Sequence, residues 1–140
     1  MGRILAIDFG TKRVGLAVSD ELKIIASPLT TVHNKDIFDF LNDYLSKETV
    51  DIIVVGEPKQ MNNQDSELVK HINPFIKKLH KVFPDVKIDR MDERFTSKMA
   101  EQAILMSGKK KKDRQNKALV DTVSAAIILQ SYMESKRGIF

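Results

Sequence analysis

The chain alternates between short apolar runs of strand length and longer segments in which apolar residues recur at helical spacing. The strand-like runs fall at residues 3–7, 14–18, 24–32, 51–55 and 86–91. The helical patterns fall at residues 35–47, 66–82, about 97–106 and 116–135. This alternation predicts an α/β domain of five strands with helices between and after them.

The lengths of the connections predict how the strands pair. The first three strands follow one another closely, so we expect antiparallel neighbours. Right-handed crossovers through helices then place the fourth and fifth strands parallel to the first. The simplest result is a mixed five-stranded sheet of order 3-2-1-4-5 with helices on both faces. Pro28 interrupts the third strand and indicates an edge position, and Asn34 is placed as the N-cap of the helix at 35–47.

Composition narrows the class of protein. The chain has 140 residues, 42% of them apolar and none of them cysteine, which suits one domain spanning residues 1–140 and excludes disulfides and thiolate metal sites. No apolar run approaches the roughly 20 residues that a membrane span needs. The first strand begins directly after Met1 and leaves no room for a signal peptide. We therefore expect a cytoplasmic protein.

Three acidic positions are expected to converge at one edge of this sheet. Asp8 ends the first strand, Asp92 and Glu93 end the fifth, and the strand order brings both ends to the same edge. Asp121 lies beside the apolar seam of the last helix, which is formed by Ala118, Thr122, Ala125, Leu129 and Tyr132. Separately, these acids are explained by a turn, a surface ion pair and a hydrogen bond to a basic side chain.

Together, three neighbouring carboxylates repel one another unless cations lie between them. Two divalent ions relieve that repulsion and supply the chemistry of phosphodiester hydrolysis. A site made only of oxygen ligands favours Mg²⁺ or Mn²⁺ over Zn²⁺. Glu57 follows the fourth strand and is either a supplementary ligand or a partner of Lys59. The three histidines show no ligand spacing and are expected to face solvent: His33, His71 and His80.

The basic residues are unevenly distributed, although the net charge is only +4. Six of them fall within residues 109–117: Lys109, Lys110, Lys111, Lys112, Arg114 and Lys117. Such a cluster suits a polyanionic partner, whose phosphates it would neutralise. A solvated loop explains the same run equally well.

Four motifs resemble the YqgF/RuvX family of Holliday-junction-resolvase-like nucleases, which have an RNase H-like fold. They are Ile-Asp-Phe-Gly-Thr-Lys-Arg-Val-Gly at 7–15, Val-Val-Gly-x-Pro at 54–58, Asp-Glu-Arg-Phe-Thr-Ser at 92–97, and Asp121 followed by an Ser-Ala-Ala-Ile-Ile-Leu run at 124–129. The resemblance implies that Asp8, Glu93 and Asp121 are the catalytic, metal-binding carboxylates. It also implies that Lys12, Arg13 and Arg94 lie near a nucleic-acid substrate.

The family is linked with maturation of the 5′ end of the precursor of 16S rRNA, and was earlier proposed to cut branched DNA. Related resolvases carry a second acid one turn before the helix aspartate, where this chain has Lys117 and Ala118. The second metal ion is therefore expected to bind weakly or only together with substrate phosphate. Glu57 stands where the family commonly has leucine, which leaves the substrate-side details of that loop open.

Alternative functions follow from the same residues. A resolvase of branched DNA would use the same carboxylates, and a non-catalytic nucleic-acid-binding module would use the lysine cluster alone. The Asp8-x-Gly10-Thr11 sequence also resembles the first phosphate loop of actin-like phosphotransferases. Those enzymes need two such domains, so the length of this chain argues against the last alternative. We therefore expect a Mg²⁺- or Mn²⁺-dependent nuclease, with structured RNA favoured over branched DNA.

Overall fold

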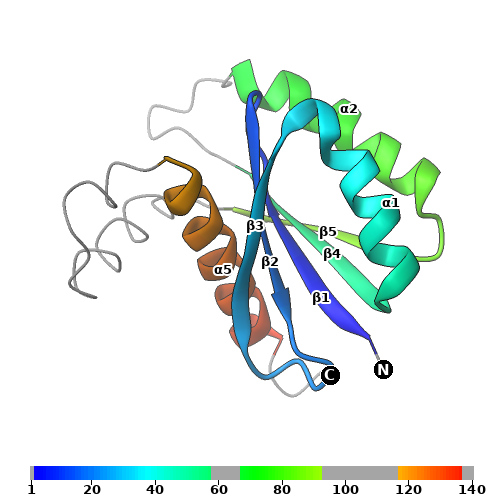
Figure 1. Cartoon of the computed structure of the whole chain (residues 1–140), viewed down its shortest axis with the longest axis vertical. Helices are drawn as coiled ribbons and strands as arrows, with labels where there is room; N and C mark the ends of the chain where they lie inside the picture. The colour runs from blue at the N-terminus through cyan, green and yellow to red at the C-terminus, as the bar shows by residue number, and fades with distance from the viewer. Residues whose placement is uncertain (1, 58–66, 93–116, 137–140) are drawn as a thin grey trace.

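The computed structural model describes residues 2–57, 67–92 and 117–136, which form a mixed five-stranded sheet between two helical layers (Figure 1). The strands are β1 (Arg3–Asp8), β2 (Arg13–Ser19), β3 (Ala26–His33), β4 (Val50–Glu57) and β5 (Lys87–Asp92). Their order is β3-β2-β1-β4-β5. β1 is antiparallel to β2, and β2 to β3, whereas β4 is parallel to both β1 and β5. The predicted sheet order and strand directions are confirmed.

The helices divide between the two faces of the sheet. The short 3-10 helix η1 (Asn34–Asp36) leads into α1 (Ile37–Lys47), which packs with α2 (Glu67–Val82) on one face. Of the described helices, only α5 (Lys117–Ser135) lies on the other face, as Figure 1 shows. The helix predicted at about 97–106 lies outside the described residues. Among the described helices, none is long and apolar enough to span a membrane.

β1 occupies the centre of the sheet because its side chains are apolar on both faces. Leu5 and Ile7 belong to the core beneath α1 and α2, whereas Ile4 and Ala6 belong to the core beneath α5. All four are fully buried. Burying an aliphatic side chain stabilises a fold by about 1.5–3 kcal/mol, so the central strand is strongly fixed. The residue that follows this run, Asp8, is thereby held at a defined position.

The face of α5 that meets the sheet is close to the predicted seam. Ala125, Leu129 and Tyr132 are buried as expected, and Thr122 is half-buried. The seam also includes Ser124, Ile128 and Met133, which are buried as well. The helix therefore packs through a broad stripe of small and large side chains.

Two local predictions are settled by the structure. β3 is an edge strand, and its pairing with β2 shifts register next to Pro28. The prediction that Asn34 caps α1 is wrong, because α1 begins after Asp36 and the Asn34 side chain makes no cap. Its Nδ2 instead donates to the Gly10 carbonyl at 2.6 Å. Pro74 lies within α2, which remains one helix.

Candidate metal and nucleic-acid site

Asp8 is the last residue of β1 and lies half-buried at the end of the sheet. Side chains alternate across a strand, so Asp8 takes the same face as Ile4 and Ala6, the face covered by α5. Phe9, the next residue, packs into the core on the opposite face. The end of β1 therefore presents a carboxylate to one side of the sheet and an aromatic ring to the other.

The two strands beside β1 place glycines next to Asp8. In the sheet register Asp8 is paired with Gly15 of β2 and with Gly56 of β4. Directly paired residues share a face of the sheet. No side chain from either neighbouring strand therefore flanks Asp8 at its own level. The neighbouring strands therefore do not block the approach of a ligand to the Asp8 carboxylate.

This row of the sheet extends in both directions from Asp8. Gly15 is paired with Thr31 of β3, and Gly56 is paired with Met91 of β5. Glu57 and Asp92 are paired one residue beyond the row, where β4 and β5 both end. The ends of β1, β4 and β5 therefore lie at one edge of the sheet, as predicted from their order.

Side-chain hydrogen bonds of Thr122 and Tyr132 fix α5 against the sheet. The hydroxyl oxygens of Thr122 and Thr31 lie 2.6 Å apart, which attaches the early part of α5 to the row that contains Asp8. Further along the helix, the Tyr132 hydroxyl donates to Asp89 of β5 at 2.8 Å. In Figure 1 the first turns of α5 accordingly lie toward the end of the sheet where β1 stops.

Asp121 immediately precedes Thr122 in α5. Its backbone position is one turn before Ala125 and two turns before Ile128, both of which are buried against the sheet. The anchored helix thus brings the backbone of residue 121 to the level of Asp8. The Asp121 side chain and the Glu57 side chain are not among those that the structure describes.

Burial and hydrogen bonding change the titration of the tyrosine that anchors α5. Burial raises the pKa of the Tyr132 phenol far above its ordinary value of 10.0, and the neighbouring Asp89 carboxylate raises it further. The phenol therefore remains a proton donor at any physiological pH. The anchor between α5 and β5 is thus present wherever the protein is folded near neutrality.

The turn between β1 and β2 carries the predicted substrate contacts Lys12 and Arg13. Lys12 is exposed, and Arg13 is the half-buried first residue of β2. Asn34 holds this turn at two points, because its backbone N–H donates to the Lys12 carbonyl at 2.9 Å and its side chain to the Gly10 carbonyl. The two cations are therefore presented from a fixed turn beside Asp8.

The remaining predicted site residues lie outside the described residues. They are Glu93, Arg94, Lys109, Lys110, Lys111, Lys112 and Arg114. Among the side chains that the structure does describe, no three of His, Cys, Asp or Glu gather as a metal would require. The convergence of Asp8, Glu93 and Asp121 thus stays a prediction. The three histidines are exposed, as expected.

Sequence reasoning did not single out Thr31, Thr122 or Asn34 for the roles they have here. Each acts through a partner far away in the chain, so no local pattern marks it. Gly56 lies within the Val-Val-Gly-x-Pro motif, and its register beside Asp8 follows from the predicted pairing of the first and fourth strands. That signal was available in the sequence.

The mixed sheet of order 3-2-1-4-5, with an aspartate at the end of its central strand, is the arrangement that the resemblance to RNase H-like nucleases implies. The solved structure of T. thermophilus RuvC in complex with a Holliday junction substrate has a similar fold. It aligns with a TM-score of 0.61 over 99% of this chain and 97% of that one, at 18% sequence identity. The chain belongs to the RuvX family, whose model, described as a Holliday junction resolvase, matches residues 2–135.

Curated relatives match the chain over nearly its whole length. One from Phocaeicola vulgatus is 59% identical over 139 residues, which is 99% of this chain and 100% of the relative. Another, from Bacteroides fragilis, is 56% identical over 137 residues, covering 98% and 99% respectively. Both carry the name "Putative pre-16S rRNA nuclease".

Proposed function

We propose that this protein is a metal-dependent nuclease that hydrolyses phosphodiester bonds during 5′-end maturation of the precursor of 16S rRNA. The observation that carries the proposal is the position of Asp8. Its carboxylate ends the central strand between two glycines, at the level of the sheet to which Thr122 anchors α5. The names of the curated relatives support the choice of substrate.

The residues present fit a divalent metal. Asp8 offers a hard oxygen donor on a rigid strand, and the glycines paired with it on both sides place no side chain next to its carboxylate in the sheet. Asp8, Glu93 and Asp121 would hold the ions, with Glu57 as a supplementary ligand. When bound, Mg²⁺ or Mn²⁺ would orient the attacking water and stabilise the leaving oxygen, with the second ion depending on substrate phosphate.

The basic residues would bind the RNA backbone. Lys12 and Arg13 stand on the fixed turn beside Asp8, and Arg94, Lys109, Lys110, Lys111, Lys112 and Arg114 would extend the contact. Neutralising phosphates with these cations makes binding weaken steeply as salt is added. An rRNA precursor substrate also implies a cytoplasmic location.

Cleavage of branched DNA is the second candidate. The description of the family model as a Holliday junction resolvase favours it. The same carboxylates would serve either substrate, so the two candidates differ in what the protein recognises. Only a direct comparison of substrates separates them.

The deciding experiment offers the protein a precursor 16S rRNA fragment and a synthetic four-way DNA junction, each with Mg²⁺ or Mn²⁺. Asp8→Asn is tested beside the wild type because it keeps the shape of the side chain but removes its charge. Asp43→Asn is the matched control, since Asp43 is exposed on α1 and forms a surface ion pair with Lys47.

We expect the wild type and Asp43→Asn to cut the RNA, and Asp8→Asn to bind it without cutting. Cleavage of the junction but not of the RNA would identify branched DNA as the substrate. Full activity in Asp8→Asn would overturn the metal mechanism. Binding of both substrates with no cleavage by the wild type would identify a non-catalytic nucleic-acid-binding module.

A further inference from the structure

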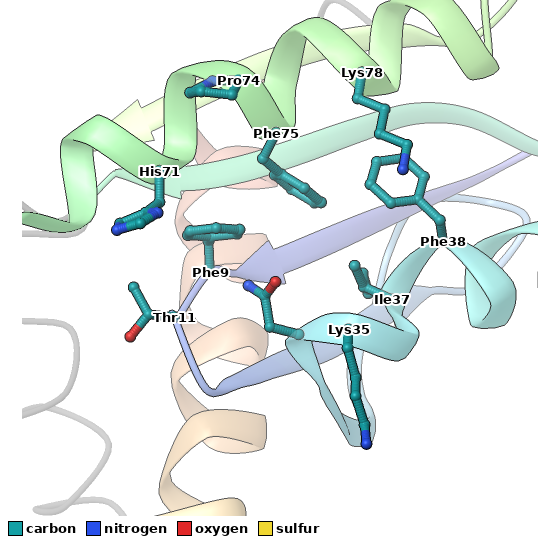
Figure 2. Close-up of a pocket in the computed structure, with 10 residues that line it drawn as sticks. Phe9, Thr11, Lys35, Ile37, Phe38, His71, Pro74, Phe75 and Lys78 are labelled. Atoms are coloured by element: carbon teal, nitrogen blue, oxygen red, sulfur yellow. The ribbon is translucent and has the colours of Figure 1, made fainter.

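A cavity of about 410 Å³ lies on the face of the sheet opposite Asp8. It opens between the β1–β2 turn, the start of α1 and the middle of α2 (Figure 2). Phe9 forms part of its wall, so the cavity begins at the residue directly after the candidate catalytic carboxylate. None of the sequence motifs discussed above assigns a role to this cavity.

Three phenylalanine rings form the apolar wall of the cavity. Phe9 and Phe75 lie with their ring centroids 4.7 Å apart, and Phe38 meets Phe75 edge-on at 5.5 Å. Phe9 is 4% exposed and Phe75 7%, so their rings are held in the core and present only part of their surface. Rings packed in this way give a rigid surface for a planar apolar group.

Basic side chains surround this wall. The Lys78 ammonium lies 4.3 Å from the centroid of the Phe38 ring, and Figure 2 shows His71 beside Phe9. Lys35 extends away from the rings in the same view. It also lines an adjoining cavity of about 520 Å³, together with Lys12, Arg13 and His33.

Among the lining residues that the structure describes, neither cavity contains an Asp or a Glu. The two cavities share Thr11, Asn34 and Lys35, so they form one continuous surface. The ammonium groups of Lys12, Lys35 and Lys78 attract an anion to this surface. The combination suits a ligand that joins a phosphate to a planar ring.

The cavity is also preformed. The two hydrogen bonds from Asn34 to Lys12 and Gly10 fix the turn that carries Thr11 and Lys12 against η1. A preformed site avoids the cost of ordering loops when the ligand binds. The wall, the cations and the turn are therefore held in place before any substrate arrives.

We propose that this cavity binds one nucleotide of the substrate strand that neighbours the scissile phosphate. The base lies against Phe9, Phe38 and Pro74, and the phosphate lies toward Lys35 and Lys12. The strand crosses the end of β1, where Asp8 and Phe9 face opposite sides of the sheet. This inference rests on the proposed nuclease function for its substrate, but the nucleotide site is testable without cleavage.

The first test is an NMR titration of the isotope-labelled protein with adenosine 5′-monophosphate, in EDTA so that no metal contributes. Adenosine and inorganic phosphate are titrated separately. We expect the monophosphate to shift the signals of Thr11, Asn34 and His71 and to bind more tightly than either fragment. Lys78→Met and Lys35→Met should each raise its Kd at least about fivefold.

Lys81→Met is the matched control, because Lys81 is an exposed lysine of α2 that does not line either cavity. Its Kd should equal that of the wild type. Equal affinity for inorganic phosphate and the monophosphate would overturn the proposal, since the site would then bind any anion. NMR shifts confined to residues around Asp8 would also overturn the proposal. An unchanged Kd for the monophosphate in both Lys78→Met and Lys35→Met would overturn it as well.

A second test uses RNA cleavage. Lys78→Met should raise KM for the RNA severalfold and leave kcat within about twofold of the wild type, whereas Asp8→Asn should abolish kcat. An unchanged KM in Lys78→Met would contradict the proposal. If the wild type cut no substrate, the proposed function would fail, and the titration alone would decide whether the cavity binds nucleotides.

Discussion

The hydroxyl groups of Thr31 and Thr122 meet at 2.6 Å across the interface between β3 and α5. Thr31 is in the same row of the sheet as Asp8, with only Gly15 between them. Asp121 precedes Thr122 directly. A hydrogen bond between residues 91 positions apart in the chain therefore sets the level at which the helix aspartate stands relative to the strand aspartate.

Replacing Thr122 with valine should impair catalysis more than stability. The change keeps the shape of the side chain and removes the hydrogen bond to Thr31, which is worth about 1 kcal/mol. We expect the apparent affinity for Mg²⁺ to fall severalfold, because α5 is no longer held at the level of Asp8. Urea unfolding and Mg²⁺ titrations of cleavage measure the two effects.

Thr30→Val is the control for this prediction. Thr30 is the neighbouring residue of β3 and is paired with Leu16, whose side chain belongs to the core on the opposite face. The control should leave Mg²⁺ dependence unchanged. A Thr122→Val protein with the Mg²⁺ affinity of the wild type would show that the bond does not position the site.

A methyl group at Gly10 should disturb the β1–β2 turn. A Cβ built at this position would collide with the backbone carbonyl oxygen of Arg13, so the turn must shift. We expect Gly10→Ala to lose at least about 1 kcal/mol of stability. RNA binding should weaken as well, because Lys12 and Arg13 stand on this turn.

Thermal unfolding and filter-binding with RNA test the Gly10→Ala prediction together. Because the turn is held by Asn34, Asn34→Ala should give a milder form of the same defect, with the loss of the bond to Gly10. A Gly10→Ala protein that melts and binds RNA as the wild type does would show that the turn absorbs the added methyl group.

Removing the Tyr132 hydroxyl should destabilise the fold. Tyr132→Phe takes away the donor to Asp89, and a hydrogen bond to a charged group contributes about 1.5–3 kcal/mol. Burial raises the pKa of the folded phenol above its ordinary value of 10.0. The contribution of the protonated hydroxyl to the free energy of unfolding is therefore complete below pH 10. It is lost as the pH rises further, because the unfolded chain ionises first.

Urea unfolding at pH 7 and at pH 10.5 separates these effects. The wild type should lose stability between the two pH values, and Tyr132→Phe should lose less. Tyr44→Phe is a useful comparison, because burial also raises the pKa of Tyr44, whereas no Asp among the described residues accepts a hydrogen bond from its hydroxyl. If the free energy of unfolding depended equally on pH in the wild type and in Tyr132→Phe, the loss of stability could not be assigned to Tyr132.

The sheet could be predicted because local features determine it. Short connections favour antiparallel pairing of the first three strands, and Pro28 favours an edge strand over a central one. The apolar residues on both faces of β1 require a central position, which places Asp8 at the edge shared by β1, β4 and β5. The position of the candidate site therefore follows from the hydrophobic pattern.

The contacts that adjust the site could not be predicted in the same way. Asn34 has the residue type and the sequence position of an N-cap, but its side chain donates a hydrogen bond to the carbonyl of Gly10, 24 residues away. His71 is exposed, as predicted, yet its place in the wall of the cavity depends on how α2 packs against β4 and β5. Such relationships arise from packing between elements, which a local pattern does not encode.

Asp51 should make stability depend on pH in the acid range. It accepts hydrogen bonds from Lys23 at 3.1 Å and from the Gly2 backbone N–H at 2.9 Å. The Lys23 bond first, and the Gly2 bond second, lower the pKa of Asp51 below its ordinary value of 3.8. The charged form is thus favoured by folding, and its contribution is lost as the pH falls below 3.8.

The effect should be modest, because the Asp51 side chain is 44% exposed and solvent screens such pairs to about 1 kcal/mol or less. Asp51→Asn should be less stable than the wild type at pH 7 and nearly equal to it at pH 2. Asp43→Asn, which breaks the more exposed pair with Lys47, should change little at either pH. Gly2 and Lys23 attach the start of β1 and the β2–β3 loop to Asp51 of β4. A difference in the free energy of unfolding between wild type and Asp51→Asn that stayed constant from pH 7 to pH 2 would contradict this prediction. It would mean that the shape of the Asp51 side chain, rather than its charge, holds these segments together.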